Sequence, residues 1–259
     1  MSFADLGAVG AGALVGAVLG LVGGGGSILA VPLLVYGVGV ASPHVAIGRS
    51  ALAVSLNALS GLVAHARAGN VKWPCATVFS IAGVVGAAFG SSLAKAVDGH
   101  KLLALFGLMM IVVGGAMLRA PRRPERPDVR LSPQTAGELA PPLVGLGLGV
   151  GTLSGFFGIG GGFLIVPGLM AATRMPMIAA VGTSLVSVAA FGATTAGNYA
   201  LSGLVDWRVG SFFIGGGIAG GRRRRGKNAR GSQERAALVF GAIVIAVGVY
   251  VSGRGLMEI

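Results

Sequence analysis

The chain has 259 residues, of which 54% are hydrophobic and only 11% are charged, and its formal net charge is +12. Soluble domains carry about 25% charged residues, so this composition excludes a soluble domain and predicts an all-α integral membrane protein. The basic residues cluster in the connections between apolar runs, which indicates membrane topology rather than nucleic-acid binding. The single cysteine, Cys75, excludes an internal disulfide.

Apolar runs that predict helices follow one another along the chain. They lie at 6–22, 27–41, 50–64, 74–94, 102–118, 143–157, 163–172, 177–200, 209–221 and 236–252. Several are shorter than the roughly 20 residues that a spanning helix needs, and the short runs flank glycine clusters, as half-helices would. No basic segment precedes the first run, so we expect a retained membrane helix rather than a cleaved signal peptide.

The chain is predicted to consist of two repeats joined by a linker. Residues 119–135 contain four prolines and five arginines, which is typical of a solvated connection. Matching residues recur on either side of it: Pro32 and Pro167 at an offset of 135, and Gly48 with Gly182, Ser50 with Ser184, Trp73 with Trp207 and Gly114 with Gly248 at 134. We therefore expect a first transmembrane repeat at 1–119, a cytoplasmic linker at 120–135 and a second repeat at 136–259.

The distribution of positive charge favours inverted repeats over parallel ones. If each half has three crossings plus a glycine-tipped hairpin, broken or re-entrant, 15 of the 20 Lys and Arg residues fall on one side. With four crossings in each half, the charges divide almost equally. Cytoplasmic loops carry the Lys and Arg excess, so we expect inverted repeats with both termini outside. A hairpin that crosses the membrane fully twice places the same Lys and Arg residues on each side, so charge does not distinguish it from a re-entrant hairpin.

Two glycine clusters in corresponding positions are the main candidate site. The first comprises Gly23, Gly24, Gly25, Gly26 and Ser27, and the second comprises Gly158, Gly160, Gly161 and Gly162. A Val-Pro pair follows each cluster within a few residues. Irregular backbone at membrane depth is tolerated only when it is buried in protein or lines a wet cavity. The helix that starts after each cluster, at Ser27 or Phe163, would present free N–H groups and a positive dipole end to an anion. The alternative is that these glycines serve only close helix packing.

Polar residues on the helices that follow the clusters could complete the site. Ser184, Ser187, Thr194, Thr195 and Asn198 are spaced along one helical face, and Ser50, Asn57 and Ser60 form a sparser copy in the first half. Neutral hydroxyls and amides can bind an anion without a buried counter-charge, although ordinary interhelical hydrogen bonding gives the same pattern. His44 and His65 could titrate near neutral pH, but loop histidines usually have no sensor role.

Motifs of soluble and membrane enzymes are missing from the sequence. No apolar run carries an acid or base in its centre, which argues against an intramembrane carboxylate relay. The sequence contains no HExxH, GxSxG, P-loop or CxxC motif, so we expect neither an enzyme, a cofactor nor a bound metal.

The doubled G-x-x-G-x-G-G-G-x-x-x-V-P pattern, with Gly182-Thr183-Ser184 in the second half, resembles the sulfite exporter TauE/SafE family of membrane permeases. The resemblance extends from about Leu6 to Ser252. It implies export of sulfite or organosulfonates across the inner membrane. The first half departs from the family pattern, because Gly48-Arg49-Ser50 stands where Gly-Thr-Ser is usual.

We therefore expect a multi-pass secondary transporter for a small anion in the inner (plasma) membrane, with the lipid bilayer and the anion as partners and proton or other ion coupling left open. The site would combine the two glycine clusters with Ser50, Asn57, Thr183, Ser184 and Asn198. The alternatives are an anion channel and a membrane-embedded enzyme or assembly subunit. The oligomeric state is not predicted.

Overall fold

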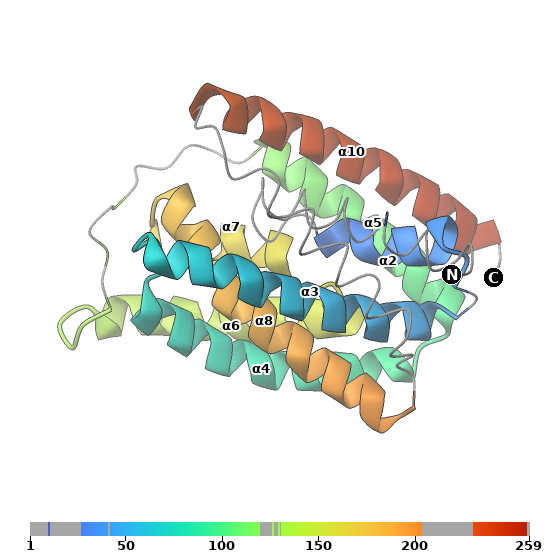
Figure 1. The fold of residues 1–259 in the computed structure, drawn as a ribbon, viewed down its shortest axis with the longest axis horizontal. Helices are drawn as coiled ribbons and strands as arrows, with labels where there is room; N and C mark the ends of the chain where they lie inside the picture. Colours follow the sequence, from blue (N-terminus) through green and yellow to red (C-terminus); the bar gives the residue numbers. More distant parts are fainter. Residues whose placement is uncertain are drawn as a thin grey trace.

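The computed structural model describes residues 27–40, 42–119, 131–203 and 230–257, together with positions 10, 126 and 129. All regular structure in these residues is helical (Figure 1). The first half contains α2 (Ala30–Pro32), a π-helical turn at Leu33–Gly37, α3 (Pro43–Arg67), α4 (Trp73–Lys95) and α5 (Gly99–Arg119). The second half contains α6 (Ala136–Phe157), α7 (Gly162–Thr173), α8 (Met177–Leu201) and α10 (Arg230–Met257).

Five of the described helices are long and apolar enough to span a bilayer, namely α3, α4, the Gly99–Ala116 part of α5, α6 and α8. The outer face of α4 carries Ile81, Val85 and Phe89, whose side chains are 64%, 61% and 65% exposed. Large apolar side chains repeating every four residues on an exposed face are expected where a helix meets lipid. The protein is thus a multi-pass membrane protein.

Local sequence signals explain where α3 and α5 begin. Pro43 opens α3 at a position where its missing N–H is not needed. The helix therefore starts seven residues before the predicted apolar run, and Arg49 lies within α3 rather than at its edge. Asp98 precedes α5, and its Oδ1 accepts from the N–H groups of His100 at 3.0 Å and Lys101 at 3.3 Å. These bonds cap the first turn of α5 and lower the pKa of the Asp98 carboxyl.

Corresponding helices of the two halves pack antiparallel against each other. On α3 and α8, Ser55 Oγ donates to the Ala189 carbonyl at 2.7 Å, and Gly61 lies against Leu185 while Ala51 lies against Gly192. On α5 and α10, Gly107 lies against Gly248 and Gly114 against Gly241. In each pair the residue number rises on one helix as it falls on the other. Ser55 and Ala189 are also separated by the 134-residue offset of the repeat.

Small residues bring α4 and α6 into close, parallel contact. A Cβ placed on Gly151 would meet the backbone of Gly83, and one on Gly155 would meet the backbone of Ala87. Glycine removes the side chains that would otherwise separate two helix backbones, which is the usual way in which membrane helices approach closely. Glycine therefore allows the close approach of α6, the first arm of the hairpin that carries the second glycine cluster, to α4.

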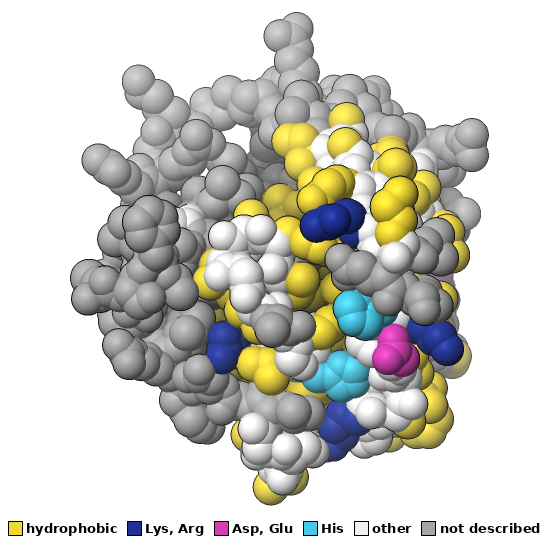
Figure 2. All heavy atoms as spheres, turned by 90° about the vertical axis from the view of Figure 1, so that its right-hand side faces the viewer, with side chains coloured by type: hydrophobic (Ala, Val, Ile, Leu, Met, Phe, Trp, Pro, Cys, Tyr) yellow, Lys and Arg dark blue, Asp and Glu magenta, His cyan; other side chains and the backbone are white. Residues whose placement is uncertain are grey.

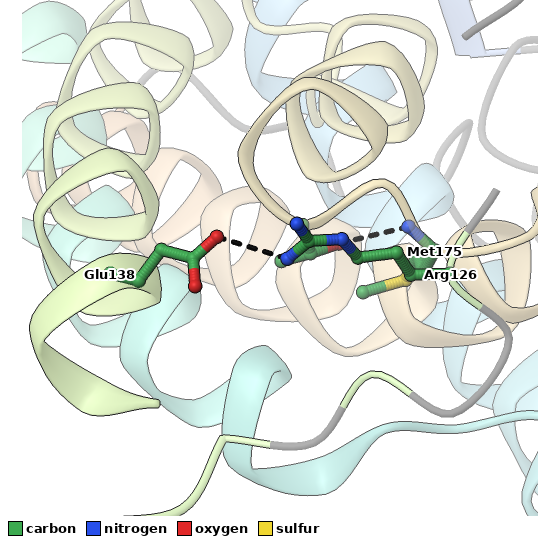
Figure 3. Close-up of polar contacts among 4 residues, drawn as sticks. Arg126, Glu138 and Met175 are labelled. Carbon is green, nitrogen blue, oxygen red and sulfur yellow. Dashed lines mark hydrogen bonds and ion pairs between the residues drawn. The ribbon is translucent and has the colours of Figure 1, made fainter. Parts of the chain in front are cut away.

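The two ends of the bundle carry different side chains. At one end the Arg126 N–H donates to the Arg174 carbonyl at 2.7 Å. Arg126 also pairs with Glu138 at 2.9 Å, beside Met175 (Figure 3). At the other end, Figure 2 shows histidine, acidic and basic side chains gathered together. The ends of the helices there supply His44, Lys95, Asp98, His100, Lys101 and Arg254.

Candidate functional site

The second glycine cluster forms the tip of a helical hairpin. Helix α6 ends at Phe157, residues 158–161 turn the chain, and α7 begins at Gly162. Gly158, Gly160 and Gly161 have φ values of 64°, 62° and 68°, in the left-handed region that side chains strongly disfavour. Because Glu138 on α6 and Arg174 after α7 both contact Arg126, the hairpin returns to the end of the bundle from which it started.

The tip is buried inside the bundle rather than lying at its far end. Residues 157–163 are all buried. A Cβ on Gly158 would collide with Ile47 of α3, and one on Gly160 would lie 2.7 Å from Val54 Cγ1 and 3.5 Å from Val188 Cγ1. Val54 and Val188 lie near the middles of α3 and α8. The 12 residues of α7 span about 18 Å at 1.5 Å per residue, roughly half of a 30 Å hydrocarbon core.

One face of α3 holds the tip in place. Ser50 Oγ contacts the Gly158 carbonyl at 2.8 Å and the carbonyl of Ile47 at 3.0 Å. Val54, one turn further along α3, meets Gly160. Asn57 follows Val54 by three residues on the same face and is 3% exposed. The structure thus brings Ser50 and Asn57 to the side of α3 that faces the glycine tip.

Several buried polar atoms near the tip have no partner in the part of the chain that the structure describes. They are Ser154 Oγ and both amide atoms of Asn57. Ser154 is fully buried, and its Oγ would lie 2.7 Å from a Cβ on Gly161. An unsatisfied buried polar atom costs about 1–3 kcal/mol, so such atoms normally bind water or a ligand. An unused hydroxyl therefore lies beside the tip at Ser154, and an unused amide lies at Asn57 on the face of α3 that carries Ser50 and Val54.

Backbone groups contribute to the electrostatics of the tip. The first N–H groups of a helix have no intrahelical acceptor, and at α7 they start at Gly162, beside the tip. The positive end of the α7 dipole adds to their effect. The described acids with placed side chains, Asp98 and Glu138, lie at helix ends and are exposed. No group of potential metal ligands occurs among the described residues.

Comparison with known proteins assigns the chain to a family. The family model described as "Sulfite exporter TauE/SafE" matches residues 8–251. The chain belongs to the TauE/SafE family. No solved structure gives a significant match. Together with the apolar helices, the family shows that the protein is a multi-pass membrane transporter.

Similar proteins occur in several organisms. A "Probable membrane transporter protein" of Xylella fastidiosa (strain 9a5c) is 51% identical over 248 residues, covering 95% of this chain and 94% of the relative. The "Probable membrane transporter protein YunE" of Bacillus subtilis is 29% identical over 264 residues, covering 95% and 97%. A further relative, from Methanocaldococcus jannaschii, is 29% identical over 184 residues, covering 66% and 65%.

The Gly-Thr-Ser residues of the TauE/SafE pattern lie on the first turns of α8. Gly182 lies close to the Asn70 carbonyl, where a Cβ would be 2.6 Å away. Thr183 Oγ1 accepts from the N–H of Lys72 at 3.0 Å, which ties α8 to the start of α4. Ser184 Oγ donates to the Val181 carbonyl at 2.8 Å. The contacts of Gly182 and Thr183 join α8 to the α3–α4 loop, whereas the Ser184 bond lies within α8.

Asn198 lies at the opposite end of α8 in a separate polar cluster. Its Nδ2 donates to Ser91 at 2.7 Å and Ser92 at 2.9 Å, while its Oδ1 accepts from Lys95 Nζ at 2.8 Å. The structure thus does not bring Asn198 together with the tip. In the first TauE/SafE glycine cluster, Gly23–Gly26 lie outside the described residues, and Ser27 is fully buried at the start of the helical segment Ser27–Gly37.

Sequence reasoning missed Ser154 as a site residue and did not separate Thr195 from its neighbours. Ser154 directly precedes the doubled glycine motif, so its position next to the cluster was an available signal. Thr195 and Thr194 look alike in sequence. In the structure Thr194 Oγ1 donates to the Ala190 carbonyl at 2.9 Å, whereas Thr195 Oγ1 is buried without a partner among the described residues.

Proposed function

We propose that this chain is a secondary transporter that moves a small oxyanion, of the sulfite or organosulfonate class, outward across the inner membrane. The family name points to the substrate class. The observation that carries the proposal is the buried tip at Gly158–Gly162, with the unpartnered Ser154 hydroxyl beside it. An anion channel built on the same site is the second candidate, and saturable counterflow distinguishes a carrier from a channel.

The tip suits an oxyanion because it offers backbone and neutral side-chain donors. Backbone N–H groups at the start of α7 would bind one side of the anion. The hydroxyl of Ser154 and the amide of Asn57 would donate to its remaining oxygens. Burying a charge is very costly unless it is hydrogen-bonded, and these donors offset that cost.

We further propose that the two halves are inverted repeats. Inversion requires equivalent helices to run in opposite directions, and the antiparallel α3–α8 and α5–α10 pairs agree with that requirement. The contact of Arg126 with Arg174 agrees with a hairpin that returns to its own side. Ser184 corresponds to Ser50 at an offset of 134 residues, and Gly23 corresponds to Gly158 at the 135-residue offset of the glycine clusters, so Ser184 would serve the first cluster as Ser50 serves the second. The anion would bind between the two tips.

The positive-inside rule gives this arrangement a sidedness that labelling can test. The end that holds Arg126 and Arg174 would be cytoplasmic, and the end that holds Lys101 and Arg254 would be external. In a Cys75→Ser background, Arg254→Cys should react with an impermeant thiol reagent in intact cells. Arg126→Cys should react only after permeabilisation. Equal reaction at both positions in intact cells would contradict the inverted arrangement.

Transport by purified protein tests the site itself. Ser154→Ala removes a hydroxyl that has no partner in the described structure, so the fold should lose no stability. If that hydroxyl binds the anion, the KM for radiolabelled sulfite or methanesulfonate in proteoliposomes should rise about tenfold or more. Thr152→Val on the same helix is the matched control, because Thr152 Oγ1 already donates to the Leu148 carbonyl at 2.9 Å. Unchanged kinetics for Ser154→Ala would refute the site.

A further inference from the structure

One face of α8 continues from the glycine tip toward the far end of the bundle. Val188, Gly192, Thr195 and Tyr199 follow one another at helical spacing on this face. Val188 lies against Gly160, and Gly192 lies against Ala51 and Ser55 of α3. Beyond them, the Tyr199 ring makes an edge contact with His44, with centroids 6.5 Å apart. Gly192 lies opposite Ala51 and Tyr199 lies opposite His44. Because α3 and α8 are antiparallel, Thr195 therefore lies opposite the part of α3 between His44 and Ala51.

Thr195 and Tyr199 are unusual among the hydroxyl-bearing residues of the bundle. Both are fully buried, and neither hydroxyl has a partner in the part of the chain that the structure describes. Other threonines on the helices have partners: Thr77 donates to the Trp73 carbonyl at 2.9 Å, Thr173 donates to the Leu169 carbonyl at 2.8 Å, and Thr183 accepts from the Lys72 N–H at 3.0 Å. Buried hydroxyls are normally satisfied, so two unsatisfied ones, one turn apart, call for a bound partner.

The surroundings of Tyr199 connect it with the tip. Its ring belongs to the same buried cluster as Ile47, Phe157 and Ile159, and the last two flank Gly158 at the tip. His44 lies in the first turn of α3, at the end of the bundle that carries the histidine and charged side chains seen in Figure 2. The two hydroxyls therefore lie between the tip and that end of the molecule.

We infer that Thr195 and Tyr199 form a second subsite for the same oxyanion, on the outward side of the glycine tip. This inference rests on the proposed transport function. Each hydroxyl donates to one oxygen of the anion after it leaves the tip, and the apolar neighbours exclude water from the other side. The anion then reaches the end of the bundle at His44. A site of this kind shortens the step between the tip and the external solution, as multi-site conduction requires.

Conservative substitutions test the subsite. Tyr199→Phe and Thr195→Val each remove one hydroxyl and retain most of the side-chain volume. In proteoliposomes, each should raise the KM for radiolabelled sulfite and methanesulfonate by about tenfold or more. The thermal midpoint in detergent should stay the same or rise, because the lost hydroxyl had no partner in the described protein. Tyr250→Phe and Thr77→Val are matched controls on exposed positions and should leave both quantities unchanged.

The outcomes separate the subsite from the transport function. Unchanged kinetics in both Tyr199→Phe and Thr195→Val, alongside an impaired Ser154→Ala variant, would overturn the subsite and leave the tip in place. A fall in thermal midpoint that matches the loss of transport would also overturn it, because the hydroxyls would then be structural. A wild-type protein that moves neither anion would refute the proposed function itself.

Discussion

Replacing Gly160 by alanine tests two reasons for glycine at the hairpin tip, namely the left-handed backbone and the close packing against Val54. A left-handed backbone at φ 62° costs a residue with a Cβ about 1–2 kcal/mol. The added Cβ would also lie 2.7 Å from Val54 Cγ1, and overpacking of this kind costs about 1–3 kcal/mol. Gly160→Ala should therefore lower the free energy of unfolding by about 2–5 kcal/mol.

A double-mutant cycle measures the two parts separately. Val54→Ala removes Cγ1 and leaves Val54 Cβ at 3.6 Å from the new methyl group, which is an ordinary contact. In that background Gly160→Ala should cost only the backbone part, about 1–2 kcal/mol. The free energies come from reversible unfolding in mixed micelles. Gly145→Ala is the control, because a Cβ there meets nothing within 4 Å. Equal costs of Gly160→Ala in both backgrounds would refute the packing of the tip against α3.

Three further substitutions probe the neighbourhood of the site. Ser50→Ala leaves the buried Gly158 carbonyl without its 2.8 Å donor and should lower the free energy of unfolding by about 1–3 kcal/mol; a change below about 0.5 kcal/mol would contradict the contact. Lys95→Met breaks the bonds that join the ends of α4 and α8 and should lower the same quantity by about 1 kcal/mol, whereas unchanged unfolding would show that the cluster is dispensable. Asp98→Ala removes a cap whose carboxyl has a lowered pKa in the folded state. Its destabilisation should be complete above the unfolded pKa of about 3.9 and shrink as the pH falls below it, and a pH-independent loss would contradict the cap.

Much of the architecture follows from sequence patterns that depend on local chemistry. Apolar length predicted α4, α5 and α8 closely, and the doubled motif predicted a turn between α6 and α7. The helical segment starting at Ser27 is also confirmed. The start of α3 was less well predicted, because a hydropathy run registers apolar residues and misses the helix-starting role of Pro43.

The composition of the site was harder to predict because it depends on which helices pack together. Asn57, Thr183 and Asn198 are all polar residues within apolar runs. The sequence around each of them does not show which groups its side chain bonds. The structure gives Thr183 a partner on the α3–α4 loop and Asn198 partners on α4, while Asn57 has none among the described residues. Periodicity assigns a residue to a face of its own helix, whereas tertiary packing decides what that face meets.

Ligand protection at Ser154 tests most directly the claim that the glycine tip binds the transported anion. Ser154→Cys in a Cys75→Ser background places a thiol next to Gly161. The rate of its reaction with N-ethylmaleimide would be measured in proteoliposomes with increasing methanesulfonate, and with chloride at equal ionic strength as the control. The account predicts that methanesulfonate slows the reaction in a saturable manner and that chloride does not. A reaction rate that is the same in both salts at every concentration would contradict it.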